Sequence, residues 1–134
     1  MAPIPEAFHD LFEKRTYAHV ATLMPDGTPH VTPVWVDYDA DAERLLVNTV
    51  RGRLKERNVS RDRKVGVGMI DPDDAYRFVS VRGAVERGTE EGAVEHIDEL
   101  ARRYFGVDEY PHHDEEEGAR VIVEIPAENV ATSG

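Results

Sequence analysis

The chain has 134 residues, no cysteine and a formal net charge of −11 at pH 7. This length suits one domain with a single core, and the lack of cysteine excludes a disulfide framework, a thiolate nucleophile and a zinc–thiolate site. No stretch approaches the ~20 consecutive apolar residues of a membrane span, and the first residues lack the basic start and apolar middle of a signal peptide. We therefore expect a single domain over residues 1–134, located in the cytoplasm, with no membrane partner.

Apolar periodicity and turn signals predict three helices and six strands along the chain. In chain order these are a helix at 5–15, strands at 16–24, 28–39 and 44–50, a helix within 51–64, strands at 64–70 and 76–88, a helix at 89–106 and a strand at 119–130. Pro29 and Pro33 cannot donate ladder hydrogen bonds, so parts of the second strand should lie at an edge or a bulge. In the last helix Thr89 is a natural N-cap, and Gly106 is expected to end the helix. The predicted apolar stripe of this helix consists of Val94, Ile97, Leu100, Ala101 and Tyr104.

Strands in hairpin-like order with short helices between them are typical of a small antiparallel barrel. The helices are too few and too unevenly spaced for a doubly wound parallel sheet. The sequence therefore predicts a mainly β (α+β) fold, in which six antiparallel strands form a barrel with short flanking helices.

The stretch 51–64 concentrates positive charge in a chain that is otherwise acidic. Seven of the sixteen cations lie there beside only two acids, namely Arg51, Arg53, Lys55, Arg57, Arg61, Arg63 and Lys64. Three interpretations are possible: a phosphate site, a solvated helix that pairs with the protein's own acids, and a nucleic-acid site. Exposed ion pairs contribute only ~0–1 kcal/mol, so internal pairing is a weak reason for such a concentration. Single-stranded nucleic acid requires stacking aromatics, which 44–64 lacks, and we expect no nucleic-acid partner.

A strand end followed by a glycine and a short helix favours anion binding. Free backbone N–H groups at the helix start point at the ligand, and the helix dipole favours negative charge. If the helix begins near Gly52, Arg51 and Lys55 share one of its faces. The other face then carries Arg53, Arg57 and Arg61. Thr49 adds a hydroxyl at the end of the preceding strand.

The balance of charged residues suggests a saline environment. Thirteen of the sixteen cations are arginine and three are lysine, beside 27 acids. Such a surface is a plausible adaptation to high salt, because strong screening makes a large net charge tolerable. The alternative is an ordinary acidic mesophilic protein, and under either interpretation duplex DNA is not expected to bind.

Similarity to a known family extends over most of the chain, in the segments 19–39, 45–74, 77–88 and 97–106. In this order they resemble the pyridoxamine 5′-phosphate oxidase-like flavin-binding split-barrel superfamily. Within it they are most similar to the branch of small proteins that use the deazaflavin coenzyme F420. The resemblance implies a split β-barrel homodimer with the cofactor between the two chains, either F420 or, as the alternative, FMN.

The resemblance also implies which residues bind the cofactor. The cofactor phosphate would be held by Thr49, Arg53, Lys55 and either Arg51 or Arg57. The ring system would lie along the second strand, in contact with Val31, Thr32, Pro33 and Trp35. Trp35 has a second interpretation, as an aromatic of the core or of the dimer interface. The chain ends in Asn-Val-Ala-Thr-Ser-Gly, where relatives often carry an aromatic, so no cofactor contact is assigned to the tail.

The implied activity is hydride transfer to or from a small conjugated substrate, with the cofactor supplying the chemistry and the protein supplying binding and orientation. No catalytic side chain is predicted, because His30 and Tyr38 near the ring are more readily explained as structural residues. No metal site is predicted either, since the histidines and acids of 111–117 are typical of a solvated loop. The alternatives are an FMN-dependent oxidase, a non-catalytic flavin carrier or sensor and, more remotely, an RNA-binding module.

Overall fold

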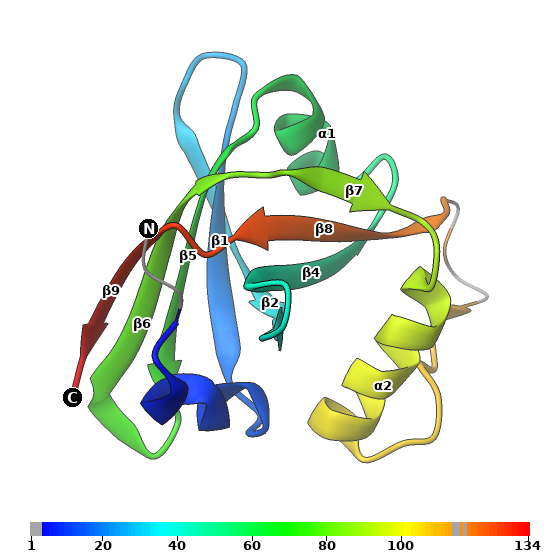
Figure 1. The fold of residues 1–134 in the computed structure, drawn as a ribbon. Helices are drawn as coiled ribbons and strands as arrows, with labels where there is room; N and C mark the ends of the chain where they lie inside the picture. The colour runs from blue at the N-terminus through cyan, green and yellow to red at the C-terminus, as the bar shows by residue number, and fades with distance from the viewer. Residues whose placement is uncertain (1–3, 114–115, 117) are drawn as a thin grey trace.

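The computed structural model describes residues 4–113, 116 and 118–134, which form two antiparallel sheets and three helices (Figure 1). The first sheet, in the order β2-β1-β5-β6-β9, consists of β1 (Tyr17–Leu23), β2 (Pro29–Trp35), β5 (Lys64–Asp71), β6 (Asp74–Ala84) and β9 (Asn129–Ser133). The second sheet, in the order β3-β4-β8-β7, consists of β3 (Asp37–Asp39), β4 (Arg44–Val50), β7 (Arg87–Thr89) and β8 (Arg120–Pro126). The helices are the 3₁₀ helix η1 (Glu6–Phe12), α1 (Leu54–Arg61) and α2 (Ala93–Phe105). The predicted mainly β fold with antiparallel sheets is confirmed.

Three of the six predicted strands are interrupted, and at each interruption the chain passes from one sheet to the other. The predicted strand 28–39 becomes β2 and β3, 76–88 becomes β6 and β7, and 119–130 becomes β8 and β9. Corners of this kind allow one continuous segment to line both sheets of a packed pair. The six predicted strands are therefore nine in the part of the chain that the structure describes.

The core lies between the two sheets, where each strand turns every second residue inward. The first sheet contributes Val20, Val67, Val79 and Val81, and the second contributes Leu45, Val47, Val123 and Ile125. The helix η1 adds Phe8, Leu11 and Phe12 to the same core, as its predicted apolar face requires. β2 lies at an edge of the first sheet, which confirms the prediction drawn from Pro29 and Pro33.

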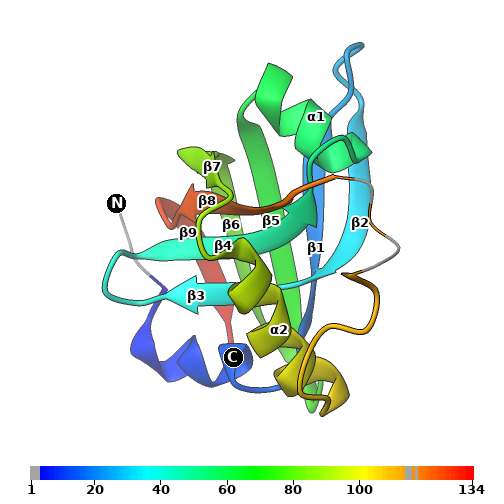
Figure 2. The same cartoon turned by 90° about the vertical axis from the view of Figure 1, so that its right-hand side faces the viewer.

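The helix α2 packs on β4 and β8, on the face of the second sheet that turns away from the core (Figure 2). Gly106 ends the helix at φ 73°, as predicted. The predicted N-cap Thr89 is wrong, because this residue ends β7 and Gly92 is the N-cap at φ 74°. The prediction for Val94 is also wrong, since its side chain is 49% exposed and Ala93, four residues before Ile97, is buried in its place. None of the helices among the described residues is long and apolar enough to cross a membrane.

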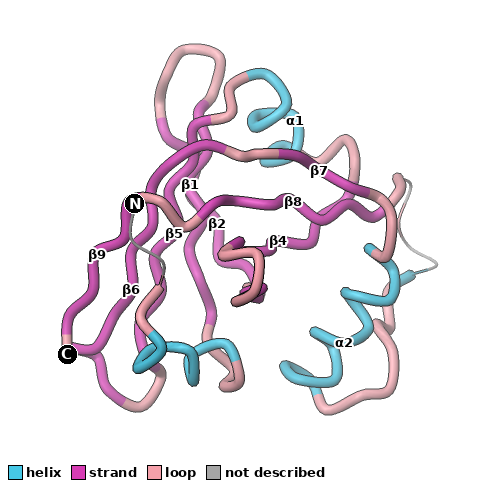
Figure 3. The backbone as a smooth tube through the Cα atoms, viewed as in Figure 1, coloured by secondary structure: helices cyan, strands magenta, loops and turns pink. Residues whose placement is uncertain are grey.

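The loop after α2 runs back along the helix toward the start of β8 (Figure 3). Asp98 of α2 anchors this loop, because its Oδ1 accepts hydrogen bonds from the backbone N–H of Tyr110 and from Nε2 of His113, each at 2.8 Å. The anchored loop brings Tyr110 over Arg120, with the guanidinium carbon 4.7 Å from the ring centroid. Tyr110 and Arg120, which a polar loop separates in the sequence, thus meet beside β4.

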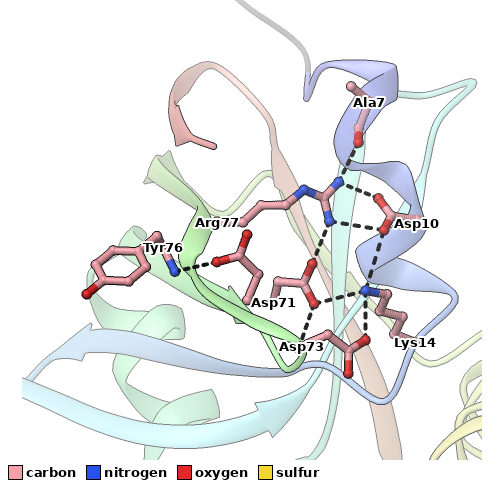
Figure 4. Close-up of polar contacts among 8 residues, drawn as sticks. Ala7, Asp10, Lys14, Asp71, Asp73, Tyr76 and Arg77 are labelled. Carbon is pink, nitrogen blue, oxygen red and sulfur yellow. Dashed lines mark hydrogen bonds and ion pairs between the residues drawn. The ribbon is translucent and has the colours of Figure 1, made fainter.

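A cluster of ion pairs ties the turn between β5 and β6 to η1 (Figure 4). Asp71 accepts hydrogen bonds from Nζ of Lys14 at 2.9 Å and from Nη1 of Arg77 at 2.8 Å. Arg77 also donates to Asp10 of η1 at 2.6 Å, and Lys14 pairs with Asp73 at 3.0 Å. These contacts fix the amino-terminal segment against the first sheet, away from the basic stretch.

Candidate functional site

A cavity of about 230 Å³ lies where β1, β2, β4, α1, α2 and the start of β8 meet. Its apolar and aromatic wall consists of Tyr17, Pro33, Val34, Trp35, Ile97 and Tyr110. Its polar wall consists of Arg53, Lys55, Arg120 and Asn48. A planar, partly apolar ligand that also carries negative charge matches this division into two walls.

The aromatic wall is held rigid by packing behind it. Trp35 stacks on Tyr104 with 5.0 Å between ring centroids and 12° between planes, and the edges of Phe105 and Tyr110 meet the same indole ring. The hydroxyl of Tyr104 donates to the carbonyl of Thr16, which ties α2 to the segment before β1. Trp35 thus lines the cavity and also packs in an aromatic cluster, while its contact with a cofactor ring stays a prediction.

Lys55 carries a charge in the polar wall that none of the described residues neutralises. Its side chain is half-buried, and its ammonium group makes no hydrogen bond or ion pair with any described residue. Burial lowers the pKa of Lys55, and the positive charges of Arg53 and Arg120 lower it further. A half-buried cation without a partner is unfavourable, so this side of the cavity favours an anion.

Arg120 supplies a buried guanidinium to the same wall. It pairs with Glu116, to which Nη2 and Nε both donate, the latter at 3.0 Å. Glu116 also pairs with Nη2 of Arg53 at 3.3 Å. Among the described residues, three cations therefore face one carboxylate, which leaves a net positive charge that an anionic ligand can neutralise.

Four of the nine residues predicted to bind cofactor line this cavity: Pro33, Trp35, Arg53 and Lys55. Thr49 does not, because β4 alternates and its side chain faces the core, where Oγ1 is buried without a hydrogen-bond partner among the described residues. Its neighbour Asn48 faces the cavity instead. Val31 is 54% exposed on β2, and Thr32 lies on the opposite, partly buried side of that strand.

The expectation that Arg51 and Lys55 share a helix face is wrong. α1 begins at Leu54, and Gly52 at φ 95° turns the chain between Arg51 and the helix. Arg51 pairs with Glu56 at 3.4 Å and with Glu90 at 3.1 Å, and it lines a separate cavity of about 200 Å³. Its charge is therefore taken up by the protein's own acids.

The other cations of 51–64 are divided between pairing and exposure. Arg61 donates to the carbonyl of Leu23 and to Asn58, and Arg63 donates to the carbonyls of Val85 and Glu86. Arg57 is exposed, and its side chain has no partner within the described ranges. Internal pairing thus accounts for Arg51, whereas no pairing among the described residues accounts for Lys55.

Sequence reasoning missed Asn48, Tyr110 and Arg120. Asn48 could have been found from strand alternation, since it must face away from the side on which Thr49 lies. Arg120 follows a run of acids in the sequence and lies far from the basic stretch, so only the pairing of β8 with β4 reveals its place.

No group of three or more histidine, aspartate or glutamate side chains among the described residues could hold a metal ion. In the segment 111–117, His113 is bound to Asp98. The positions 114, 115 and 117 of this segment lie outside the described residues.

Comparisons with known proteins agree with this architecture. A family model described as pyridoxamine 5′-phosphate oxidase matches residues 4–134. A solved F420 reductase is similar at 33% identity and a TM-score of 0.81, with 96% of this chain and 98% of that chain covered. A conserved hypothetical protein from Mycobacterium tuberculosis is 26% identical, with a TM-score of 0.75 and coverage of 97% and 84%. No curated protein matches the chain.

A putative pyridoxamine 5′-phosphate oxidase from Listeria innocua shares the fold, with a TM-score of 0.66, 18% identity and coverage of 94% and 92%. The resemblance inferred from the sequence, including its F420 branch, is confirmed by these matches. At family level they indicate a flavin- or deazaflavin-type oxidoreductase. Because the family match spans residues 4–134, the protein belongs to the pyridoxamine 5′-phosphate oxidase family.

Proposed function

We propose that the protein binds coenzyme F420 in the cavity beside α1 and transfers hydride to or from a small conjugated molecule. The observation that carries this proposal is Lys55, whose ammonium lines a cavity with an aromatic wall and has no partner in the part of the chain that the structure describes. The likeness to an F420 reductase at 33% identity favours the deazaflavin over FMN.

The cavity residues fit the parts of such a cofactor. Arg53, Lys55 and Arg120 would hold its anionic groups, because guanidinium forks and an ammonium bind phosphate oxygens through charge-assisted hydrogen bonds. Pro33 and Trp35 would lie along the ring system. A proline suits this place, since it offers an apolar surface and leaves no N–H group unpaired.

When bound, the deazaflavin ring supplies the two-electron hydride chemistry, and the side chains of this protein bind and orient it. Trp35 and Tyr110 would exclude water from one side of the ring. His30 and Tyr38 do not line the cavity. Tyr38 instead packs against Phe12, with 5.2 Å between ring centroids, which agrees with a structural role.

A homodimer is part of the proposal. The cavity of about 230 Å³ is smaller than the ~300–1,000 Å³ of typical ligand sites, so a ligand as large as F420 has to extend beyond it. Beside the cavity, Tyr17 and Val31 expose 50% and 54% of their surfaces on adjacent strands. A second copy of the chain would cover these side chains and complete the site.

Titration of F420 and FMN into the wild-type protein and the double variant Arg53→Ala/Lys55→Ala tests the proposal. We expect wild type to bind F420 more tightly than FMN, and the double variant to bind about 100-fold more weakly or worse, because each charge-assisted hydrogen bond contributes ~1.5–3 kcal/mol. Lys64→Ala is the matched control, since it removes an exposed cation outside the cavity.

Equal affinities of wild type and the double variant would rule out this cavity. Tighter binding of FMN, with consumption of oxygen, would favour the FMN-dependent oxidase. Stoichiometric binding without reduction of any electron acceptor would favour a non-catalytic carrier or sensor.

A further inference from the structure

A chain of hydrogen bonds links the buried side of α2 to the polar wall of the cavity. Oδ2 of Asp37 lies 3.0 Å from Nε2 of His96, and Nδ1 of His96 lies 3.0 Å from Nδ2 of Asn48. Oδ1 of Asn48 lies 3.2 Å from Nη1 of Arg120. Asn48 and Arg120 line the cavity, whereas His96 lies behind them and is only 8% exposed. His96 is therefore two hydrogen bonds away from a cation that faces the ligand.

The partners of Asn48 fix the direction of its side-chain amide. A guanidinium only donates hydrogen bonds, so the amide atom that faces Arg120 must be the oxygen. The amide nitrogen then donates to the carbonyl oxygen of Ala93 at 2.8 Å and to His96. A reversed amide would place a donor against Arg120 and an acceptor against the Ala93 carbonyl, and both contacts would be lost. Ala93, Arg120 and His96 thus all match the same orientation of the amide.

Only one tautomer of the His96 ring matches this direction of the Asn48 amide. Because Nδ1 accepts a hydrogen bond from Asn48, the proton of the neutral ring lies on Nε2, which donates to Asp37. Asp37 is itself held by Arg103, whose Nη2 donates to its Oδ1 at 3.0 Å. Burial raises the pKa of Asp37, but hydrogen bonds from His96 and Arg103 outweigh this effect and lower the pKa to about 2. The charged carboxylate can therefore hold the ring in one tautomer.

We propose that His96 is a positioning residue, which sets the Asn48 amide and through it the Arg120 guanidinium for binding the anionic group of the cofactor. This inference rests on the proposed function. Of the five N–H donors of an arginine, Asn48 takes one of those of Arg120 and Glu116 takes two, which leaves two for a ligand. If the Asn48 amide turned, Nη1 of Arg120 would lose its acceptor, Oδ1 of Asn48. The guanidinium would then be held less firmly, and so would the two donors that are left for a ligand.

Two substitutions of His96 separate its contact with Asn48 from its contact with Asp37. Asparagine places an amide oxygen near the position of Nδ1 and keeps an acceptor for Asn48, but it is too short to reach Asp37. Glutamine reaches toward Asp37 as Nε2 does, and it leaves Asn48 without its acceptor.

Affinity for F420, and in parallel for FMN, is measured by fluorescence titration of both variants, and unfolding temperature is measured beside it. We expect His96→Asn to bind within about threefold of wild type and His96→Gln to bind about tenfold more weakly or worse, because the hydrogen bond between Asn48 and the Arg120 cation is disturbed only in the second. His9→Gln is the control, since it makes the same substitution at a histidine outside the cavity, whose Nε2 lies 2.8 Å from the carbonyl oxygen of Ile4. Equal losses in the two His96 variants, or losses that follow unfolding temperature alone, would overturn the inference.

Nitrogen NMR of the histidine rings in the wild-type protein without ligand gives a second test that needs no variant. Near neutral pH we expect Nε2 of His96 to carry the proton and Nδ1 to be bare. A proton on Nδ1 would overturn the positioning role even where the cofactor binds normally. A wild-type protein that bound neither F420 nor FMN would overturn the proposed function first, and this inference with it.

Discussion

Glu116 lies against two of the three cations in the polar wall, where an anionic ligand also has to bind. Its carboxylate pairs with Arg120 through both oxygens and with Arg53 at 3.3 Å. The side chains of Glu116 and Arg120 are only 6% and 4% exposed, so water solvates neither charge well. An incoming phosphate therefore has to bind next to an internal carboxylate of like charge, which already takes two of the N–H groups of Arg120.

Glu116→Gln should tighten the binding of F420 while it destabilises the free protein. The neutral amide no longer repels the anionic groups of the ligand, and we expect affinity to rise by about tenfold. Arg120 becomes a buried charge without a counter-ion, and breaking such a pair costs about 3–5 kcal/mol. Fluorescence titration measures the first effect, and thermal unfolding with and without F420 measures the second.

The control for this variant is Glu95→Gln, which removes the same charge from the exposed side of α2 and should change neither quantity. Weaker binding by Glu116→Gln would contradict the prediction. Glu116 would then serve to orient the two guanidinium groups rather than to compete with the ligand.

Among the elements, the start of α1 shows why part of the site was not predictable. Gly52 suits either the first turn of a helix or the loop before it, and local sequence does not separate the two cases. Contacts with residues far along the chain determine that Gly52 lies in the loop before the helix. Gly118 packs so closely that a Cβ atom there would lie 2.4 Å from the carbonyl oxygen of Arg51, and the N–H of Arg51 donates to the carbonyl of Ala119 at 2.9 Å. These contacts hold Arg51 outside the helix and away from Lys55.

The strands were predictable where alternation and turn signals coincide, and less so at corners. The strand predicted at 44–50 agrees with β4, because a turn precedes it and a glycine follows it. The break between β2 and β3 falls at Val36, a fully buried apolar residue within a run of similar residues. Nothing in that run signals a change of sheet, since the corner arises from packing rather than from local preference.

Four of the ten residues that line the cavity were predicted, from segments that carry the family resemblance. Pro33, Arg53 and Lys55 come from segments whose pattern is local, namely an edge strand and a helix start. Arg120 and Tyr110 reach the cavity only because β8 pairs with β4 and the loop after α2 folds back along the helix.

The ion-pair cluster between η1 and the β5–β6 turn predicts an acid-sensitive stability. Hydrogen bonds from the Asp73 backbone, Lys14 and Arg77 hold the pKa of Asp71 well below its usual range. A carboxylate with a lowered folded-state pKa stabilises the protein above its unfolded value of ~3.9, and this contribution is lost as the pH falls toward the folded-state pKa. We expect Asp71→Asn to lower the unfolding temperature at neutral pH.

Thermal unfolding from neutral pH downward checks this prediction. The difference between wild type and Asp71→Asn should stay constant down to about pH 4 and shrink below it, because Asp71 of the wild type then becomes protonated as well. Asp41→Asn, at an exposed turn position, is the control. A difference that did not depend on pH would show that the charge of Asp71 is irrelevant to the cluster.

For the whole molecule we predict a homodimer that buries the exposed apolar side chains beside the cavity. Light scattering with size-exclusion chromatography should give twice the chain mass of 15.1 kDa. Val31→Asp should shift this equilibrium toward monomer and weaken F420 binding, because the interface would bury an unpaired charge.

Ile70→Asp makes the matched change at a position of β5 that is 56% exposed and outside the cavity. Dissociation by Ile70→Asp but not by Val31→Asp would place the interface elsewhere and contradict the prediction. The acidic surface is a separate property of the whole molecule, and its origin in a saline cytoplasm stays a prediction.

The two prolines of β2 have a consequence that reaches beyond the single molecule. At an unpaired sheet edge, strands of other molecules can form hydrogen bonds and fibres can begin to grow. Pro29 and Pro33 lie on the margin of the first sheet and offer no amide hydrogen to such a strand. Pro33, which lines the cavity, is therefore also expected to discourage a strand of a neighbouring molecule from pairing with this margin.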